Sequence, residues 1–173
     1  STSLGVVLSE IPVLKDMTWL NFAKFRTSYA VIANDASPYG TFTTYDQAAY
    51  GDGSTNGVTF PFGGQPGFAV GDGLGNAELK PEKMKSFEIG LELSLFQNRL
   101  SIDAAYYNNQ NEDLILWVPL SGTSGYTDRL MNAGEMENKG IELLISGTPI
   151  KTSDFSWDVM VNFTKNKNEV LKL

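Results

Sequence analysis

An alternating stretch decides the fold: Lys85-Ser86-Phe87-Glu88-Ile89-Gly90-Leu91-Glu92-Leu93-Ser94-Leu95. Successive side chains of a β-strand point to opposite faces, so this stretch forms a strand with one apolar and one polar face. In a soluble β-sandwich the apolar face packs on a protein core, whereas in a membrane barrel it contacts lipid. The choice between these two environments determines the function of the protein.

The composition excludes several classes of function. The chain has 173 residues with no Cys and no His, which removes thiol nucleophiles, imidazole bases, disulfides and the commonest zinc ligands. A net charge of −7, with no element rich in Lys and Arg, argues against a nucleic-acid partner. We therefore expect no enzyme, and no catalytic residue, metal or cofactor.

Five further segments have strand character, and none shows a convincing helical periodicity. They are Thr2–Glu10, Asn21–Ala33, Leu100–Tyr107, Lys139–Gly147 and Phe155–Lys165. Together with the Lys85–Phe96 segment they predict an all-β, antiparallel fold of about six strands.

The connections alternate between short and long. Short links lie around Gln97-Asn98 and at Thr148–Asp154, and long loops span about 34–83 and 108–138. Transmembrane barrels have short periplasmic turns and long extracellular loops. A strand from Lys85 to Phe96 would extend about 40 Å, or about 28 Å across a membrane when tilted by about 45°. This order of links predicts a segment of a large transmembrane β-barrel.

Aromatic residues gather near the predicted strand ends. Trp19, Phe96, Phe155 and Trp157 lie by the short turns, and Tyr29, Tyr106 and Tyr107 lie toward the long loops. Such positions are typical of the aromatic girdles at the two membrane interfaces. The alternative is that these rings fill the core of a soluble sandwich.

A lead-in motif resembles a known family. Leu79-Lys80-Pro81-Glu82-Lys83-Met84 followed by the alternating strand is similar to the strand opening of TonB-dependent outer-membrane receptors. Further motifs resemble the SusC/RagA-like branch: Ser9–Lys15, Lys24–Ala30, Asn98–Asp103, Tyr106–Asn108, Asn132–Leu143 and Asn162–Asn168. In this family the barrel has about 22 strands around an N-terminal plug. The resemblance therefore implies that residues 1–173 are an internal part of a receptor barrel, without the plug.

The resemblance also implies a function in the bacterial outer membrane. Receptors of this branch import oligosaccharides, and in some members peptides, together with a SusD-like surface lipoprotein and the TonB complex. Two alternatives stay open at this point: a TonB-dependent receptor for a siderophore or haem, and a soluble β-sandwich module that binds carbohydrate.

The barrel hypothesis assigns a role to several side chains. Five should face lipid: Phe87, Ile89, Leu91, Leu93 and Leu95. Three acidic residues should face the lumen: Glu88, Glu92 and Asp103. Flat rings among short polar residues suit sugars or peptides, so the loops supply the candidate ligand-binding residues Tyr39, Phe42, Tyr45, Tyr50 and Trp117. For each loop aromatic the alternative role is packing against neighbouring loops.

Overall fold

The computed structural model describes residues 1–51, 53–54 and 57–173, which form two compact units. The sheet unit contains Ser1–Ala33, Lys83–Glu112 and Glu135–Leu173. The loop unit contains Asn34–Glu82 and Asp113–Gly134. Each unit is described by itself below.

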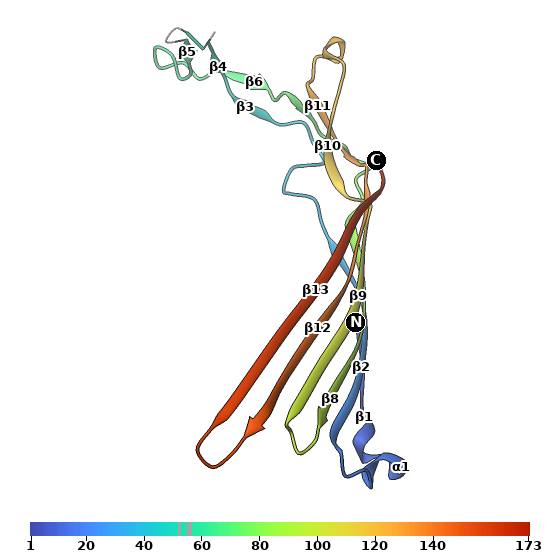
Figure 1. Ribbon diagram of the computed structural model, residues 1–173. Helices are drawn as coiled ribbons and strands as arrows, with labels where there is room; N and C mark the ends of the chain where they lie inside the picture. Colours follow the sequence, from blue (N-terminus) through green and yellow to red (C-terminus); the bar gives the residue numbers. More distant parts are fainter. Residues whose placement is uncertain (52, 55–56) are drawn as a thin grey trace. The chain divides into compact units, whose positions relative to one another are not determined.

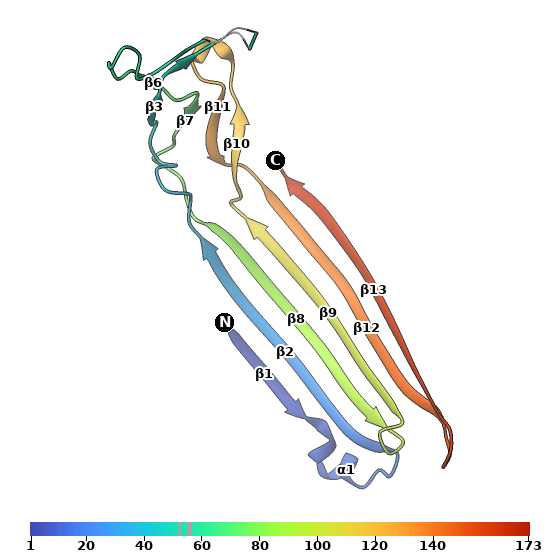
Figure 2. The same ribbon diagram turned by 90° about the vertical axis from the view of Figure 1, so that its left-hand side faces the viewer.

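The sheet unit is built on six strands that follow one another in a meander (Figures 1 and 2). Their order is β1-β2-β8-β9-β12-β13, and the pairs β1–β2, β8–β9, β9–β12 and β12–β13 are antiparallel. The bounds are β1 Thr2–Val7, β2 Leu20–Asn34, β8 Glu82–Leu95, β9 Leu100–Glu112, β12 Glu135–Lys151 and β13 Ser156–Lys172. The predicted antiparallel segment of about six strands is confirmed.

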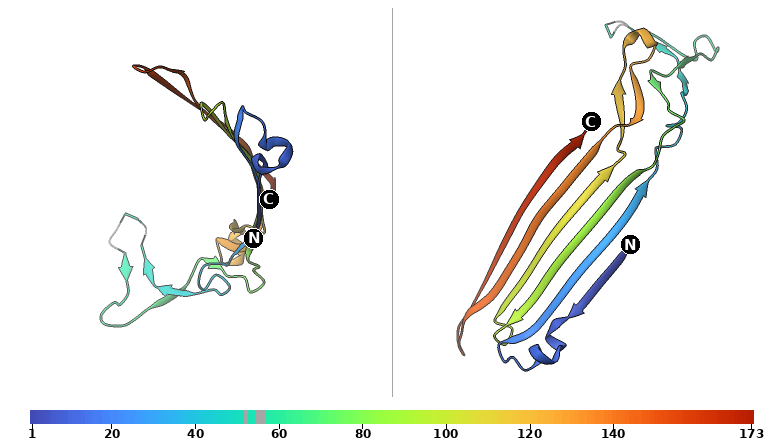
Figure 3. Two further views of the ribbon diagram at one scale, coloured as in Figure 1. Left: turned by 90° about the horizontal axis from the view of Figure 1, so that it is seen from below. Right: turned by 90° about the vertical axis from the view of Figure 1, so that its right-hand side faces the viewer.

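The sheet is a single curved layer (Figure 3). Among the described residues no large side chain is fully buried. Leu91 is 37% exposed and Ile141 is 50% exposed, although both are apolar and lie mid-strand. The apolar face therefore has no protein layer over it in this unit, which is the opposite of a sandwich core.

The link between β1 and β2 is compact and partly helical. It contains a 3-10 turn, η1 Leu8–Glu10, and one helical turn, α1 Pro12–Lys15. Proline suits the first turn of α1 because an amide hydrogen there has no helical partner. Among the residues described, no helix is long and apolar enough to cross a bilayer.

The predicted strands were too short at the ends toward the long loops. β9 continues to Glu112 and β12 begins at Glu135, so the second long loop is 113–134 rather than about 108–138. Asn138, at the predicted end of that loop, instead pairs with Asn109 within β12. Polar residues such as Asn108 and Glu137 gave these extensions no strand signal, because the prediction relied on the alternation of apolar residues.

The loop unit has short strands of its own that the sequence did not reveal. A hairpin of β10 (Ile115–Pro119) and β11 (Asp128–Asn132) pairs in parallel with β7 (Gly73–Leu74). The other elements are β3 Tyr45–Gln47, β4 Ala49–Tyr50, β5 Val58–Thr59, β6 Phe68–Val70 and η2 Gly122–Ser124. β3 pairs with β6, and β4 pairs with β5.

Candidate functional site

The sheet has two chemically different faces, which we name the Glu88 face and the Phe87 face after two neighbours on β8. Directly paired residues of neighbouring strands share a face. Glu92 pairs with Asp103, and Glu88 pairs with Tyr107, so these four residues lie together on the Glu88 face. The structure thus brings the three acidic residues assigned to the lumen onto one surface.

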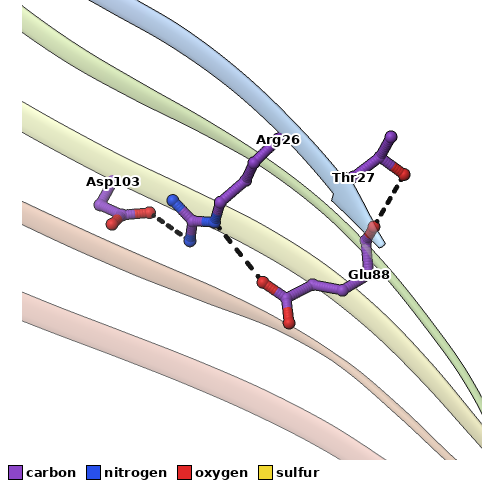
Figure 4. A network of polar contacts seen from close by, with 4 residues as sticks. All are labelled: Arg26, Thr27, Glu88 and Asp103. Carbon is purple, nitrogen blue, oxygen red and sulfur yellow. Dashed lines mark hydrogen bonds and ion pairs between the residues drawn. The ribbon is translucent and has the colours of Figure 1, made fainter. Parts of the chain in front are cut away.

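An arginine that sequence reasoning did not single out links this acidic surface (Figure 4). Arg26 on β2 donates from Nη2 to Asp103 Oδ1 at 2.9 Å, and its Nε lies 3.5 Å from Glu88 Oε1. Thr27 Oγ1 donates to the backbone oxygen of Glu88 at 3.0 Å. Arg26 therefore connects three successive strands, β2, β8 and β9, on one face.

A glycine makes the long reach of Arg26 possible. Gly90 lies on β8 beneath the guanidinium, and a Cβ there would be 2.6 Å from Arg26 Nε. A second glycine on the same face, Gly140, lies beneath Tyr107, whose hydroxyl would be 2.6 Å from an added Cβ. Glycine within a strand marks a close approach of other atoms, and both positions fit that rule.

Removing the Arg26 charge should have a small, salt-dependent effect. The side chains of Arg26, Glu88 and Asp103 are 32%, 45% and 40% exposed, so solvent screens both ion pairs. We expect Arg26→Gln to lower the free energy of unfolding by up to about 1 kcal/mol for each pair. Denaturant unfolding at low and high salt checks this, with Lys24→Gln on the same strand as the control. A loss that is equal at both salt concentrations would contradict an electrostatic role.

The Phe87 face is apolar along the middle of the sheet. The five residues assigned to lipid lie on it, paired across β9 with Leu100, Ile102, Ala104, Tyr106 and Asn108. It continues over β12 and β13 through Ile141, Leu143, Ile145, Val161 and Phe163. At the short-turn end, Phe96 and Trp157 line one apolar hollow and are each about half exposed.

The predicted aromatic residues toward the long loops lie on both faces of the sheet. Tyr29, Phe87 and Tyr106 line one hollow on the Phe87 face, where the apolar residues give way to Lys85, Asn108 and Gln110. Tyr107 lies on the Glu88 face, because it pairs with Glu88 and Gly140. Tyr107 therefore lies toward the long loops as predicted, but on the opposite face from Tyr29 and Tyr106, because neighbouring residues of a strand point to opposite faces.

The apolar part of the Phe87 face ends along a slanted line. The last apolar residues toward the loops are Phe87 on β8, Tyr106 on β9, Ile141 on β12 and Phe163 on β13. Tyr106 and Ile141 pair directly, whereas Phe87 lies one same-face step above them and Phe163 one step below. From β8 to β13, the end of the apolar part shifts by four residues, which is about 14 Å along the strands. The three strand spacings between β8 and β13 also measure about 14 Å across the sheet.

This slant corresponds to strands inclined by about 45°, which is the inclination of strands in membrane barrels. The short-turn end shifts in the same direction. Gly147 pairs with Leu100 at the end of β9, but β12 runs on to Lys151, paired with Ser156. The strand ends at the short turns are therefore displaced in the same direction as the upper end of the apolar part, as expected for inclined strands.

The loop unit contains a hollow of about 490 Å³ that brings together three of the five predicted ligand-binding residues. Tyr39, Phe42 and Trp117 line it, together with the acidic residues Asp46 and Asp72. The Trp117 ring covers the backbone of Gly73, where a Cβ would lie 2.8 Å from the ring. Rings beside carboxylates can stack on a sugar or peptide plane and accept hydrogen bonds from it.

The other two predicted residues, Tyr45 and Tyr50, do not line this hollow, and their exposed fractions are 72% and 61%. Sequence reasoning missed Asp46 and Asp72. Asp46 lies on β3, which pairs with β6, and Asp72 lies in the turn between β6 and β7, so only this pairing brings the two residues to the same hollow. The described residues hold no cluster of acidic side chains suited to a metal ion.

A family model described as "TonB dependent receptor-like, beta-barrel" matches residues 14–171. The chain belongs to this family. TonB-dependent receptor P3 of Formosa agariphila is 36% identical over 163 residues, covering 92% of this chain and 15% of the relative. The receptor SusC of Bacteroides thetaiotaomicron is 28% identical over 179 residues, covering all of this chain and 17% of SusC.

The fold agrees with a solved member of the same class. The RagAB peptide importer in its closed-closed state superposes with a TM-score of 0.78 and 25% identity, over 99% of this chain and 18% of that chain. The chain therefore spans less than a fifth of each of these proteins.

Membership of the family confirms the outer-membrane location and the absence of an enzymatic role, because the relatives are receptors and transporters. The hypothesis of a soluble carbohydrate-binding sandwich is wrong, because the sheet is a single layer within a receptor barrel.

Proposed function

We propose that the sheet unit forms six strands in the wall of an outer-membrane importer. Its Phe87 face contacts lipid, with Phe87, Ile89, Leu91, Leu93 and Leu95 among the contacts. Its Glu88 face lines the lumen, with Glu88, Glu92 and Asp103. The observation that carries this proposal is the slanted apolar band, which lies on an uncovered face and gives the strand inclination of a barrel wall.

We further propose that the substrate is an oligosaccharide or a peptide, taken up with a SusD-like lipoprotein outside and TonB inside. The likeness to SusC and to the RagAB peptide importer over nearly the whole chain supports this substrate class. The long loops, 35–81 and 113–134, would then be extracellular, and the loop hollow would contact the substrate. A siderophore or haem receptor remains the second candidate.

Co-purification tests the substrate class. The receptor that contains these strands is extracted from outer membranes in mild detergent, and bound proteins and small molecules are identified by mass. We expect a surface lipoprotein and an oligosaccharide or peptide. A bound iron chelate without a lipoprotein would contradict the proposal and favour the siderophore or haem receptor.

Truncation of the hollow tests its role in binding. We expect Phe42→Ala combined with Trp117→Ala to weaken substrate binding by about tenfold or more, because exposed rings that a ligand covers contribute much of the binding energy. Titration calorimetry with the co-purified substrate measures the change. Tyr50→Ala is the matched control, since Tyr50 lies on β4 and does not line the hollow. An equal loss of affinity in the Tyr50→Ala control would contradict a specific role of the hollow in binding.

A further inference from the structure

A tier of charged residues lies on the Phe87 face immediately beyond the apolar band, on the side toward Glu82 and Glu112. We name it the charged border. It contains five lysines and three glutamates: Lys83, Lys85, Lys139, Lys165, Lys167, Glu112, Glu137 and Glu169. The border carries an excess of positive charge, although the whole chain has a net charge of −7.

The glutamates of the border are each held by a lysine. Lys85 Nζ lies 2.5 Å from Glu112, Lys139 Nζ lies 2.5 Å from Glu137, and Lys167 Nζ lies 2.6 Å from Glu169. Asn108 Nδ2 also donates to Glu137 Oε1 at 3.1 Å. Lys165 makes no ion pair with any of residues 1–51, 53–54 or 57–173. The lysines thus outnumber the acids available to neutralise them.

A hollow of about 410 Å³ opens where the apolar band meets the charged border. Three rings line it on the apolar side: Tyr29, Phe87 and Tyr106. Lys85, Asn108 and Gln110 line it on the polar side. Such a hollow matches a ligand with an apolar chain next to an anionic, hydrogen-bonding head.

We propose that the charged border binds the phosphate groups of outer-leaflet lipids, and that the hollow at Lys85 holds the junction between head group and acyl chain. This inference rests on the proposed contact between the Phe87 face and lipid. At the end of an apolar band the next layer of a membrane is the head groups, and lysine binds phosphate as a point charge. Excess positive charge at that level is therefore complementary to lipid phosphate.

The slant of the band strengthens the argument. Lys85, Lys139 and Lys165 occupy different rows of the paired sheet, but each is the first charged residue beyond the apolar part of its own strand. On strands inclined by about 45° these positions lie at one depth in the membrane. The lysines would thus face a single layer of phosphates.

Lipid titration of the intact receptor in detergent tests the proposal. The probes are bisphosphorylated lipid A, the same lipid with both phosphates removed, and inorganic phosphate as a competitor. The test variant carries Lys139→Gln, Lys165→Gln and Lys167→Gln. The control carries Lys15→Gln, Lys24→Gln and Lys151→Gln, which removes the same charge outside the border.

We expect the unaltered receptor and the control to prefer the phosphorylated lipid by about 100-fold or more, and the test variant to lose most of this preference, since three lysines at about fivefold each contribute about 125-fold. Equal binding of both lipids by the unaltered receptor, or an unchanged preference in the test variant, would overturn the proposal. Full competition by millimolar inorganic phosphate would overturn lipid as the source of the phosphate. If neither lipid bound the receptor, the proposed contact between the Phe87 face and lipid would itself be wrong. That outcome differs from equal binding of both lipids, which would overturn only the binding of phosphate by the charged border.

Discussion

Replacing Leu91 by arginine is expected to destabilise the barrel by about 2–4 kcal/mol and to impair its assembly in the membrane. Leu91 is the middle residue of the five apolar side chains on β8, and it is 37% exposed with no protein layer over it. A charge at the centre of a lipid-facing band loses its hydration and finds no partner. The free energy of unfolding of the refolded receptor in bilayers, and its yield in outer membranes, measure the effect.

Glu92→Arg is the matched control for this experiment. It introduces the same side chain one residue further along β8, but on the Glu88 face, where Glu92 pairs with Asp103. We expect near-normal stability and assembly, since lumen-facing positions tolerate charge. The lipid-facing assignment of the Phe87 face would be refuted if Glu92→Arg were the more damaging substitution, or if Leu91→Arg had no effect.

Replacing Gly140 by alanine is the second substitution expected to have a large effect, at about 1–3 kcal/mol of lost stability. An added Cβ would lie 2.6 Å from the Tyr107 hydroxyl and 2.8 Å from the backbone oxygen of Lys165. The ring can turn away, but the oxygen belongs to β13 and moves only if the strand moves. The midpoint of denaturant unfolding in detergent or bilayers reports the loss.

Gly5→Ala is a control at another strand glycine of the same face. Gly5 pairs with Arg26, and the nearest atom to an added Cβ is Lys24 Cε at 3.7 Å, an ordinary contact. We expect this substitution to be neutral or to stabilise the protein slightly, because alanine reduces the freedom of the unfolded chain. A similar loss at both glycines would show that strand propensity, and not the close approach at Gly140, is responsible.

Sequence patterns identified the strands of the sheet unit because apolar and polar residues alternate along their central parts. Phe87 to Leu95 has an uninterrupted period of two, and one face of that period must be buried or in lipid. The patterns failed where the same strand passes into the charged border. Glu137 and Asn108 belong to strands as regular as the apolar part, but their side chains carry no hydrophobic signal.

The candidate sites were less predictable than the fold, because they depend on register. Arg26 meets Asp103 only because β2, β8 and β9 are neighbours with a glycine between the two side chains. Likewise, Asp46 joins Trp117 in the loop hollow through pairings of short strands that have no periodic pattern. Composition suggested aromatic contacts in the loops, but it could not separate Trp117 from Tyr50.

The slanted end of the apolar band also bears on the size of the opening that these strands enclose. A strand standing upright occupies about 4.8 Å of a barrel's circumference, but one inclined by about 45° occupies about 6.8 Å. Six such strands would account for about 40 Å of perimeter, against about 29 Å if they were upright. Inclination therefore widens the perimeter by roughly 40% without an additional strand, although each strand must be about 40% longer to cross the same membrane.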